Sequence, residues 1–267
     1  MRIALITGAS SGLGKAFAER IDTQEVLIDE IWLIARREER LKELAKTLSH
    51  PCRILALDLT KPESFKLIRA QLEAETIQVG LLVNCAGYAK IGNYARISPY
   101  DSLHMIDLNC KAAVSITLTA LPHMKAHDRI IHICSCAAFQ PLQHINIYAS
   151  TKAFLYQYTR ALRLELLPRK IAVTAVCPFW IKDTEFIHIA NGYGGTPDFS
   201  SEINETPPIR HFPFAVRAER VAKQALSDSR LGFAVSTPGI FCFIHRVFAK
   251  ILPRKVLLYI WEIVRRI

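Results

Sequence analysis

Residues 3–21 of the chain read IALITGASSGLGKAFAERI, and this stretch decides the fold. Four apolar residues lead into a glycine-rich turn, after which apolar residues recur at helical spacing, so it predicts a buried strand, a tight turn and a helix. Glycines let the backbone lie close to a ligand, and the unpaired N–H groups at the start of a helix favour a phosphate. The residues expected to hold that phosphate are Gly8, Ser10, Ser11, Gly12, Leu13 and Gly14. Taken alone, the pattern also fits an ordinary strand-to-helix turn.

Strand-like runs alternate with helical stretches along the rest of the chain. Short apolar runs lie at 3–6, 31–34, 53–57, 79–83, 129–134 and 171–176, with a seventh near Val235. Such alternation is typical of an α/β fold, in which strands pair in parallel and helices cover both faces. We therefore predict one domain over residues 1–238, built on a doubly wound parallel sheet of about seven strands. The carboxyl ends of such strands meet at one edge, where ligands bind; the residues expected there are Gly8, Ala35, Asp58, Asn84, Ser135 and Pro178.

Composition argues against several classes of protein. With 267 residues, 51% of them hydrophobic, the chain can bury a large core, and no apolar run reaches the roughly 18–20 residues that span a bilayer. Its seven cysteines show no paired C-x-x-C spacing, which predicts free, buried thiols in a reducing cytoplasm and no metal site. Of the net charge of +10, residues 239–267 carry +5, from six Lys or Arg and one Glu. A nucleic-acid-binding face across the body is therefore not expected.

The end of the second expected strand decides which dinucleotide the turn would bind. An NAD-specific site usually has an acidic residue there, about 20 positions after the glycine turn, to hold the ribose hydroxyls. This chain has Ala35 followed by Arg36 and Arg37, and guanidinium groups attract a 2′-phosphate that a carboxylate would repel. NADP(H) is therefore favoured. Arg36 is the better candidate, because Arg37 fits equally well on a solvated helix face with Glu38 and Glu39.

Tyr148 and Lys152 lie four residues apart in YASTK, so on a helix they share a face. A tyrosine with its ordinary pKa near 10 is a poor base at neutral pH. An ammonium group about 4 Å away would supply on the order of 4 kcal/mol, which lowers that pKa by about three and lets Tyr148 exchange protons near pH 7. Such pairs also occur by chance on helices. Ser135, thirteen residues before Tyr148, is expected to hold a substrate oxygen.

In this order and spacing, the motifs resemble those of the short-chain dehydrogenase/reductase family, whose fold is a Rossmann-type sheet. They are TGASSGLG at 7–14, NCAG at 84–87, Asn109, Ser135 and YASTK at 148–152, and the likeness covers about residues 1–184. The resemblance implies that Tyr148 exchanges the proton while Ser135 positions the carbonyl. It also implies that Lys152 binds the nicotinamide ribose and lowers the tyrosine pKa, and that Asn109 holds a water in a proton relay.

The resemblance implies further cofactor contacts. They are Asp58 and Leu59 beside the adenine, Asn84, Ala86 and Gly87 beside the central sheet and the ribose, and Pro178, Ile181 and Thr184 near the nicotinamide carboxamide.

Three residues depart from the family pattern. Cys85 stands where a second Asn is usual, Phe179 stands where glycine usually follows the proline, and Asp183 occupies the place of an expected Thr. An aromatic ring is therefore expected to enter the nicotinamide or substrate region. A one-residue bulge would bring Thr184 into the usual position of the Thr.

Together these features predict an NADP(H)-dependent oxidoreductase that interconverts a ketone or aldehyde and an alcohol. Residues 191–214 are rich in glycine, proline and aromatic residues and resemble the family's substrate lid. A steroid- or fatty-acyl-like substrate fits an apolar pocket whose candidate residues are Phe179, Trp180, Phe186, Phe212 and Phe214. The alternative is a non-catalytic NADP-binding scaffold recruited to a membrane or partner by its tail. The intact set of Asn109, Ser135, Tyr148 and Lys152 favours the enzyme.

Residues 239–267 match no motif that we can assign. Bulky apolar residues alternate there with basic ones, and Pro253 is expected to separate two short helices. Such an extension either lies on an anionic membrane surface or packs on the body or a second subunit, and both interpretations stay open. We expect a cytoplasmic homodimer or homotetramer, peripheral to a membrane in the first case. The seam is expected on the helix at 148–167, at Phe154, Leu155, Tyr158 and Leu162.

Overall fold

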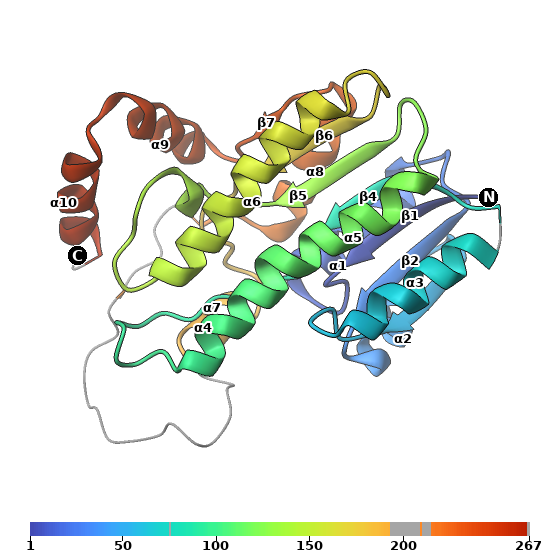
Figure 1. The fold of residues 1–267 in the computed structure, drawn as a ribbon, viewed down its shortest axis with the longest axis horizontal. Helices are drawn as coiled ribbons and strands as arrows, with labels where there is room; N and C mark the ends of the chain where they lie inside the picture. Colours follow the sequence, from blue (N-terminus) through green and yellow to red (C-terminus); the bar gives the residue numbers. More distant parts are fainter. Residues whose placement is uncertain (75, 193–208, 210–214, 266–267) are drawn as a thin grey trace.

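A computed structural model describes residues 1–74, 76–192, 209 and 215–265. Within these residues, seven strands form one parallel sheet in the order β3-β2-β1-β4-β5-β6-β7 (Figure 1). The chain leaves β1 toward β2 on one side and returns to β4 on the other, which creates a crevice at the carboxyl ends of these two strands. The predicted doubly wound α/β sheet is confirmed.

The bounds of the elements follow the expected alternation. The strands are β1 (Arg2–Thr7), β2 (Glu30–Ala35), β3 (Cys52–Ala56), β4 (Gln78–Asn84), β5 (Arg129–Ile133), β6 (Ala172–Val176) and β7 (Val235–Ser236). The helices are α1 (Gly12–Gln24), α2 (Glu38–Ala45), α3 (Pro62–Ala74), α4 (Pro99–Ile106), η1 (Asp107–Ala112), α5 (Ala113–Ala120), η2 (Leu121–His123), η3 (Cys136–Phe139), α6 (Asn146–Glu165), α7 (Phe186–Ala190), α8 (Ala218–Arg230), α9 (Ile240–Ile251) and α10 (Arg254–Val264).

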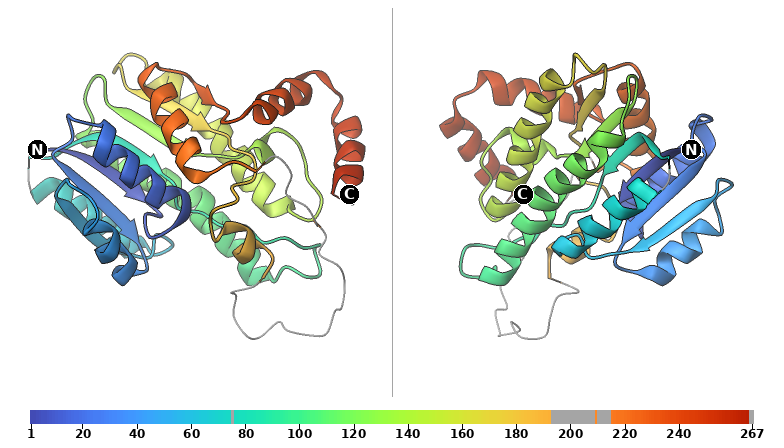
Figure 2. Two further views of the ribbon diagram at one scale, coloured as in Figure 1. Left: turned by 180° about the vertical axis from the view of Figure 1, so that it is seen from behind. Right: turned by 45° about the vertical axis from the view of Figure 1, so that its right-hand side comes forward.

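Both faces of the sheet are covered by helices. Helices α3, α5 and α6 lie on the face nearer the viewer in Figure 1, and α1 and α8 come forward when the molecule is turned around (Figure 2). Successive side chains of a strand point to opposite faces. In β1, Ala4 and Ile6 therefore join the core under α1 and α8, while Ile3 and Leu5 join the core under α3 and α5. All four side chains are fully buried, which explains the unbroken apolar run in the sequence.

The helical stretch between β4 and β5 is divided. Helix α4 passes into a π-helical segment, η1, before α5 resumes the ordinary helical turn. A π segment widens the turn by one residue and is often found at functional sites. Asn109 lies within this segment.

The predicted seam on α6 is wrong in part. Leu155 and Leu162 are buried within the subunit, each in a core cluster of the described residues. Phe154 is 49% exposed, and its ring stacks on that of Tyr158 with 6.4 Å between the centroids. Helical spacing identified an apolar helix, but it did not show which of its faces packs on the sheet.

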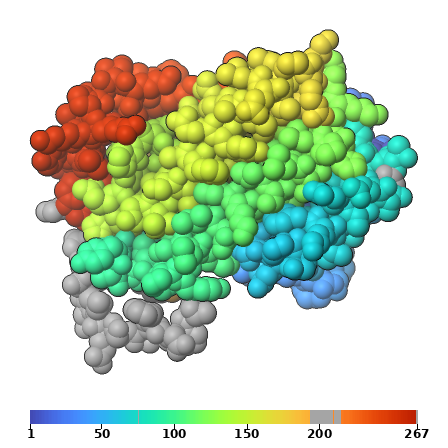
Figure 3. Space-filling view, in the orientation of Figure 1, coloured from blue at the N-terminus to red at the C-terminus, as the bar shows by residue number. Residues whose placement is uncertain are grey.

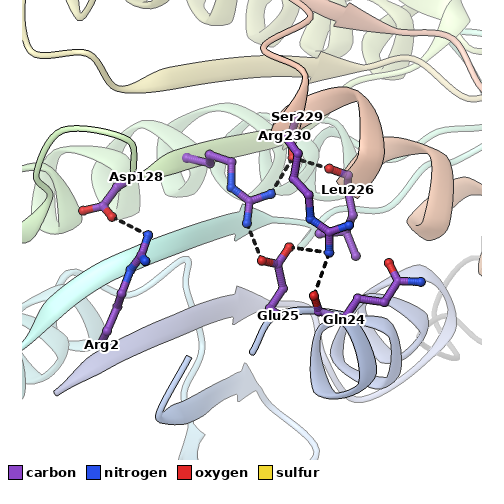
Figure 4. Close-up of polar contacts among 8 residues, drawn as sticks. Arg2, Gln24, Glu25, Asp128, Leu226, Ser229 and Arg230 are labelled. Carbon is purple, nitrogen blue, oxygen red and sulfur yellow. Dashed lines mark hydrogen bonds and ion pairs between the residues drawn. The ribbon is translucent and has the colours of Figure 1, made fainter. Parts of the chain in front are cut away.

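Polar side chains tie the amino ends of the strands together (Figure 4). Glu25, just after α1, forms ion pairs with Arg129 of β5 at 2.6 Å and with Arg230 of α8 at 3.1 Å. Nearby, Arg2 of β1 pairs with the fully buried Asp128 at 2.8 Å. These contacts stabilise the edge of the sheet opposite the expected ligand site.

The extension at 239–265 forms the two predicted short helices. Helices α9 and α10 lie at one end of the molecule, red in Figures 1 and 3, with Pro253 between them. No helix in the described part of the chain is both long and apolar enough to cross a bilayer.

Candidate active site

A cavity of about 1200 Å³ lies at the carboxyl ends of the strands. The glycine turn, the start of α6 and the two C-terminal helices all contribute to its walls. It brings together all but two of the predicted site residues, namely Gly8, Ser10, Ser11, Gly12, Leu13, Gly14, Arg36, Arg37, Asp58, Leu59, Ala86, Gly87, Ser135, Tyr148, Lys152, Pro178, Ile181 and Thr184. The two that do not line it are Asn84 and Asn109.

The glycine turn is as tight as the sequence predicts. Gly8 and Gly12 have φ angles of +70° and +52°, in the left-handed region that favours glycine. A Cβ atom on Gly14 would lie 2.2 Å from the carbonyl oxygen of Gly8, and one on Gly8 would lie 2.9 Å from the backbone of Ala86. Any side chain at these two positions would therefore displace the backbone that shapes the cavity.

The start of α1 presents its backbone N–H groups to the cavity. Within the described residues 1–74, Ser11 at the N-cap makes no capping hydrogen bond through its side chain, and the first turn of α1 holds no acidic residue. The positive end of the helix is thus not neutralised by the helix's own side chains. This arrangement suits an anion such as a phosphate.

Arg37 has a larger role than the sequence predicted. Its guanidinium donates to Ser11 Oγ at 2.6 Å and forms an ion pair with Glu185 at 2.8 Å. Its side chain is 42% exposed, and Lys42 is the residue that pairs with Glu38 and Glu39. Two exposed arginines therefore line this end of the cavity, and Arg37 is the one with polar contacts to the glycine turn and to Glu185.

Asp58 is held at the end of β3 by its own loop. Its carboxylate accepts hydrogen bonds from the Thr60 amide at 3.0 Å and hydroxyl at 2.8 Å. Burial alone would raise the pKa of Asp58, but these hydrogen bonds and the nearby charge of Arg36 lower it below its usual value. The carboxylate is therefore ionised at neutral pH.

Asn84 does not face the cavity, contrary to the expected ribose contact. Its side-chain amide donates to Thr117 Oγ1 at 2.9 Å and to the Ala113 carbonyl at 3.2 Å, both on α5. Asn84 is buried there and fixes the end of β4 against that helix. The adjoining backbone is held from the other side, because Thr7 Oγ1 accepts the amides of Cys85 and Ala86 at 3.0 Å each.

Asn109 lies just behind the cavity wall. Its side chain accepts from the Tyr88 amide at 3.1 Å and donates to the Tyr88 carbonyl at 2.9 Å. A Cβ atom on Gly87 would lie 2.9 Å from Asn109 Oδ1 and 3.4 Å from Lys152 Nζ, so the three residues are in close contact. Asn109 thus positions the backbone beside Lys152, while its part in a water relay stays a prediction.

Tyr148, Ser135 and Lys152 meet at one place in the cavity, and all three are buried. Ser135 Oγ accepts the Ala137 amide at 3.1 Å at the start of η3, and Lys152 Nζ donates to the Ile133 carbonyl at 2.7 Å. The ammonium nitrogen lies 5.7 Å from the centroid of the Tyr148 ring. The three groups that the sequence placed far apart along the chain therefore converge.

The expected lowering of the Tyr148 pKa is not found, because the surrounding protein raises this pKa. Burial raises the pKa of Tyr148 well above 10, and a hydrogen bond with Ser135 only partly opposes that rise. Burial also lowers the pKa of Lys152. The sequence indicated only the attraction between the phenolate and the ammonium group. In the folded protein the cost of desolvation dominates the pKa of both Tyr148 and Lys152.

The departures from the family pattern have a local explanation. Asp183 turns away from the cavity, and its carboxylate accepts the amide of Ala218 at 2.8 Å at the start of α8. Thr184 takes the position next to the glycine turn, where a Cβ on Gly12 would lie 3.1 Å from it. Phe179 and Trp180 line the cavity, as expected of an aromatic ring after Pro178.

The C-terminal helices form a wall of the same cavity. Phe241, Ile244 and Phe248 of α9 and Leu257, Ile260, Trp261 and Val264 of α10 line it. The side chain of Gln140, just after η3, contacts both helices. Its Oε1 atom lies 2.8 Å from His245 Nε2 of α9, and its Nε2 atom donates to the Leu257 carbonyl of α10 at 3.4 Å. Trp261 Nε1 also donates to the Gln143 carbonyl at 3.1 Å. Packing on the body is thus confirmed for the buried side of the extension.

Several lining residues were missed by the sequence analysis. Tyr88 directly follows the motif at 84–87, and its hydroxyl lies 3.0 Å from His104 Nδ1; adjacency to that motif was the available signal. Phe186, by contrast, was predicted to line the pocket and does so, with 5.6 Å between its ring centroid and that of Tyr148. Phe212 and Phe214, and residues 193–208 and 210–214 of the expected lid, fall outside the described residues.

Comparison with known proteins agrees with this geometry. Residues 2–191 match the family model described as short chain dehydrogenase. The chain belongs to the short-chain dehydrogenase family. The family predicted from the motifs is confirmed, and with it the class of oxidoreductase.

Two relatives and one solved structure illustrate the likeness of this dehydrogenase to known proteins. Sulfoacetaldehyde reductase 2 of Chromohalobacter salexigens is 36% identical over 215 residues, 78% of this chain and 83% of the relative. The NADP-dependent 3-hydroxy acid dehydrogenase YdfG of Escherichia coli O157:H7 is 34% identical over 192 residues, 70% and 75% of the two chains. A short-chain dehydrogenase from Sphingobium yanoikuyae in complex with NADPH has a TM-score of 0.73 and 26% identity, covering 90% of this chain and 89% of the other.

Proposed function

We propose that this dehydrogenase uses NADP(H) to reduce an apolar ketone or aldehyde to the alcohol, with Tyr148 as the proton donor. The observation that carries the proposal is the convergence of Tyr148, Ser135 and Lys152 in one cavity that also holds the glycine turn and Arg37. A scaffold that only bound the nucleotide would not need a buried serine, tyrosine and lysine at this place.

The residues present fit NADP(H). The backbone around Gly8 and Gly14 leaves no room for a Cβ atom, and the uncapped start of α1 suits the pyrophosphate. Arg36 and Arg37 suit the 2′-phosphate, because each presents a planar guanidinium at the end of β2. When bound, the nicotinamide supplies the hydride. The NADP(H) dependence of the relatives described above supports the same cofactor.

The protonated state of Tyr148 is compatible with a role as proton donor in carbonyl reduction. Burial keeps the phenol protonated at neutral pH, which suits a group that donates a proton to a carbonyl oxygen. Ser135 Oγ, held by the Ala137 amide, is placed to hydrogen-bond that oxygen. Tyr148 Oη would donate its proton to the carbonyl oxygen during reduction, and solvent would restore the phenol. Lys152 is anchored by the Ile133 carbonyl, and its protonated form would limit the cost of a transient phenolate.

The walls of the cavity favour an apolar substrate. Beyond Tyr148 they are lined by Leu142, Phe179, Trp180 and Phe186 and by the apolar side chains of α9 and α10. The relatives named above carry small polar substrates in their names. The match with the family model ends at residue 191, before the extension that contributes to the apolar wall of this cavity. We therefore propose a substrate with a steroid- or fatty-acyl-like body.

The decisive experiment replaces Tyr148 with Phe and follows NADPH oxidation with a panel of apolar ketones. Loss of the proton donor is expected to lower turnover by at least about 100-fold, while NADPH affinity changes less than about twofold. Tyr156→Phe is the matched control, because Tyr156 lies on the same helix but does not line the cavity. Full turnover in Tyr148→Phe would contradict the proposed chemistry.

The same panel tests the substrate class and the scaffold alternative. A 3-hydroxy acid and sulfoacetaldehyde serve as polar comparators. Preference for either of them over the apolar ketones would overturn the apolar substrate but leave the chemistry intact. NADPH binding without turnover of any carbonyl would instead favour the non-catalytic scaffold.

We also propose a homo-oligomer, with the exposed apolar residues of α4, α5 and α6 at the seam. Leu103, Leu118, Phe154 and Leu164 are each about half exposed or more on these three neighbouring helices. Light scattering after gel filtration measures the mass directly. A monomer at micromolar concentration would contradict this part of the proposal.

A further inference from the structure

Helices α9 and α10 carry apolar side chains that face neither the cavity nor the body. We call this set the C-terminal surface; its members are Ile240, Phe243, Val247 and Ile251 of α9 and Tyr259 and Ile263 of α10. They are between 38% and 72% exposed, and none of them lines the cavity. The four in α9 recur every three or four residues, so they form one stripe along the helix. The opposite side of α9 holds the buried Cys242 and the Gln140 contact of His245. A stripe of this kind needs a covering partner.

The apolar lining of the cavity continues to this surface without interruption. Ile244 and Phe248 of α9 and Ile260 and Val264 of α10 line the cavity and are also between 39% and 51% exposed. Apolar side chains of the two helices therefore connect the lining of the cavity with the C-terminal surface. An apolar molecule can pass there without leaving an apolar environment, provided that the outer surface is covered by something equally apolar.

The charge around the C-terminal surface selects its partner. Lys250, Arg254 and Lys255 are exposed where the two helices meet. Within the described part of the extension, Glu262 is the one acidic residue, and it is paired with Arg265. A second copy of the chain would bring an equal excess of positive charge to the same place, which costs repulsion. An anionic lipid surface supplies both the opposite charge and the apolar phase.

The lengths of the two helices decide how they would meet a bilayer. Helix α9 has 12 residues and α10 has 11, and a helix needs about 20 residues to span the hydrocarbon core. Contact is therefore limited to the interface, where helices with an apolar stripe and basic flanks lie in the plane of the membrane.

We propose that α9 and α10 hold the enzyme on an anionic lipid bilayer with the mouth of the cavity at the acyl phase. The substrate is then an apolar ketone or alcohol dissolved in the bilayer, which enters between the two helices. The statement about the substrate rests on the function proposed above, whereas the statement about the lipid surface stands on the C-terminal surface alone.

Sedimentation with vesicles tests the lipid contact. The full chain is mixed with vesicles of phosphatidylglycerol and phosphatidylcholine, or of phosphatidylcholine alone, and the bound fraction is measured. The triple variant Phe243→Ser, Val247→Ser, Ile251→Ser is expected to bind at least about tenfold more weakly. The matched control is Leu27→Ser, Leu67→Ser, Leu231→Ser, because these three leucines are comparably exposed on other parts of the body. The control is expected to bind like the wild type, and NADPH affinity is expected to be unchanged in both variants.

A charge variant tests the choice of lipid. Replacing Lys250, Arg254 and Lys255 with Gln is expected to weaken binding to the anionic vesicles by about fivefold for each residue, with little effect on the weaker binding to phosphatidylcholine. Added salt is expected to reduce wild-type binding to anionic vesicles in the same direction.

Three outcomes would overturn the proposal. The first is a wild-type chain that stays in the supernatant with anionic vesicles while it still turns over a water-soluble ketone. The second is equal lipid binding by the triple Ser variant and its control. The third is a wild-type chain that binds no lipid and forms a dimer, while the triple Ser variant is a monomer. This result would assign the surface to a second copy of the chain. Lipid binding without turnover of any ketone would contradict the proposed function and leave the lipid contact standing.

Discussion

At the scale of single residues, His132 is a buried base that the site does not use. It lies on β5, with Nε2 at 3.0 Å from Thr117 Oγ1 and Nδ1 at 2.8 Å from Thr159 Oγ1. Burial, together with the charge of Lys152, lowers the pKa of His132 to about 3. The imidazole therefore stays neutral in the folded protein and fixes β5 between α5 and α6.

The pKa of His132 makes the stability of the protein depend on pH. In the unfolded chain the imidazole takes up a proton near pH 6.5, whereas the folded protein excludes it down to about pH 3. The stabilisation is therefore complete above pH 6.5 and is lost as the pH falls toward 3. Between pH 6.5 and 5 this amounts to about 2 kcal/mol.

Urea unfolding of the wild type and of His132→Gln at pH 7 and pH 5 measures this contribution. The variant keeps a hydrogen-bonding side chain but cannot be protonated, so its free energy of unfolding is expected to fall less over this range, by about 2 kcal/mol. Equal pH dependence in the two proteins would show that His132 is protonated in the folded state.

Residue identity alone predicted contacts that are local in the chain. Tyr148 and Lys152 share a helix, and Gly14 approaches Gly8 within one turn, so spacing was sufficient. The partners of Asn84 and Asn109 were not predictable in this way. Asn84 meets Thr117 only because α5 packs on β4, and Asn109 reaches Tyr88 from a π-helical segment that no periodicity indicated.

At the scale of elements, one ion-pair cluster joins three loops around the cavity. Arg37, before α2, contacts Ser10 and Ser11 of the glycine turn and pairs with Glu185 before α7. Arg40 of α2 pairs with the same carboxylate at 2.6 Å. The hydrogen bonds from Arg37 and Arg40 lower the pKa of Glu185, so the carboxylate is charged at neutral pH. A 2′-phosphate would compete with this carboxylate for Arg37.

Replacing Arg37 with Ala is expected to raise the Kd for NADPH by about 10- to 100-fold and to change the Kd for NADH little, because only NADPH carries the 2′-phosphate. Arg40→Ala is the matched control, since Arg40 shares the Glu185 partner but does not line the cavity. Glu185→Gln removes the competing charge and is expected to tighten NADPH binding by up to about fivefold. Fluorescence titration with both nucleotides gives these constants; equal losses for NADPH and NADH in Arg37→Ala would rule out the phosphate contact.

Element boundaries were predictable where turns and periodicity agree, as for α1 and for the division at Pro253. The packed side of an element was not predictable. Leu155 and Leu162 were expected at a subunit seam and lie inside the subunit, whereas α9 and α10 form a wall of the cavity. These placements depend on how distant elements pack, and the apolar pattern of one helix does not contain that information.

At the scale of the whole molecule, the polar contacts and the cavity lie at opposite edges of the sheet. Glu25 is 9% exposed and is the common partner of Arg129 and Arg230, so it connects the end of α1 with β5 and α8 (Figure 4). Removing it would leave the largely buried Arg129 without its carboxylate. Such a change is costly because one charge of the pair stays out of water.

Glu25→Ala is expected to lower the free energy of unfolding by about 2–3 kcal/mol, somewhat less than for a fully buried pair. Glu219→Ala is the matched control, because Glu219 pairs with Arg20 at an exposed position and should cost less than about 1 kcal/mol. NADPH affinity is expected to be unchanged in both variants, because neither glutamate lines the cavity. Equal losses of stability in the two variants would contradict a special role for Glu25.

The overall topology was the most predictable property of the chain. Alternating apolar runs and helices require a parallel sheet, and the gathering of strand ends then follows, which is why Gly8, Ser135 and Pro178 were correctly expected at one edge. The size and lining of the cavity were not predictable, because part of its apolar wall comes from an extension that matches no motif.

Gly239 joins that extension to the sheet with a φ angle of +100°, shortly after strand β7 and just before α9. The residues assigned to proton transfer all precede this junction, and much of the apolar wall follows it. The segment before Gly239 thus carries the residues for the reaction, and the segment after it contributes to substrate selectivity. A chimera spliced at this glycine would inherit the reaction from one parent and its choice of molecule largely from the other, so the junction is a natural crossover point for recombination.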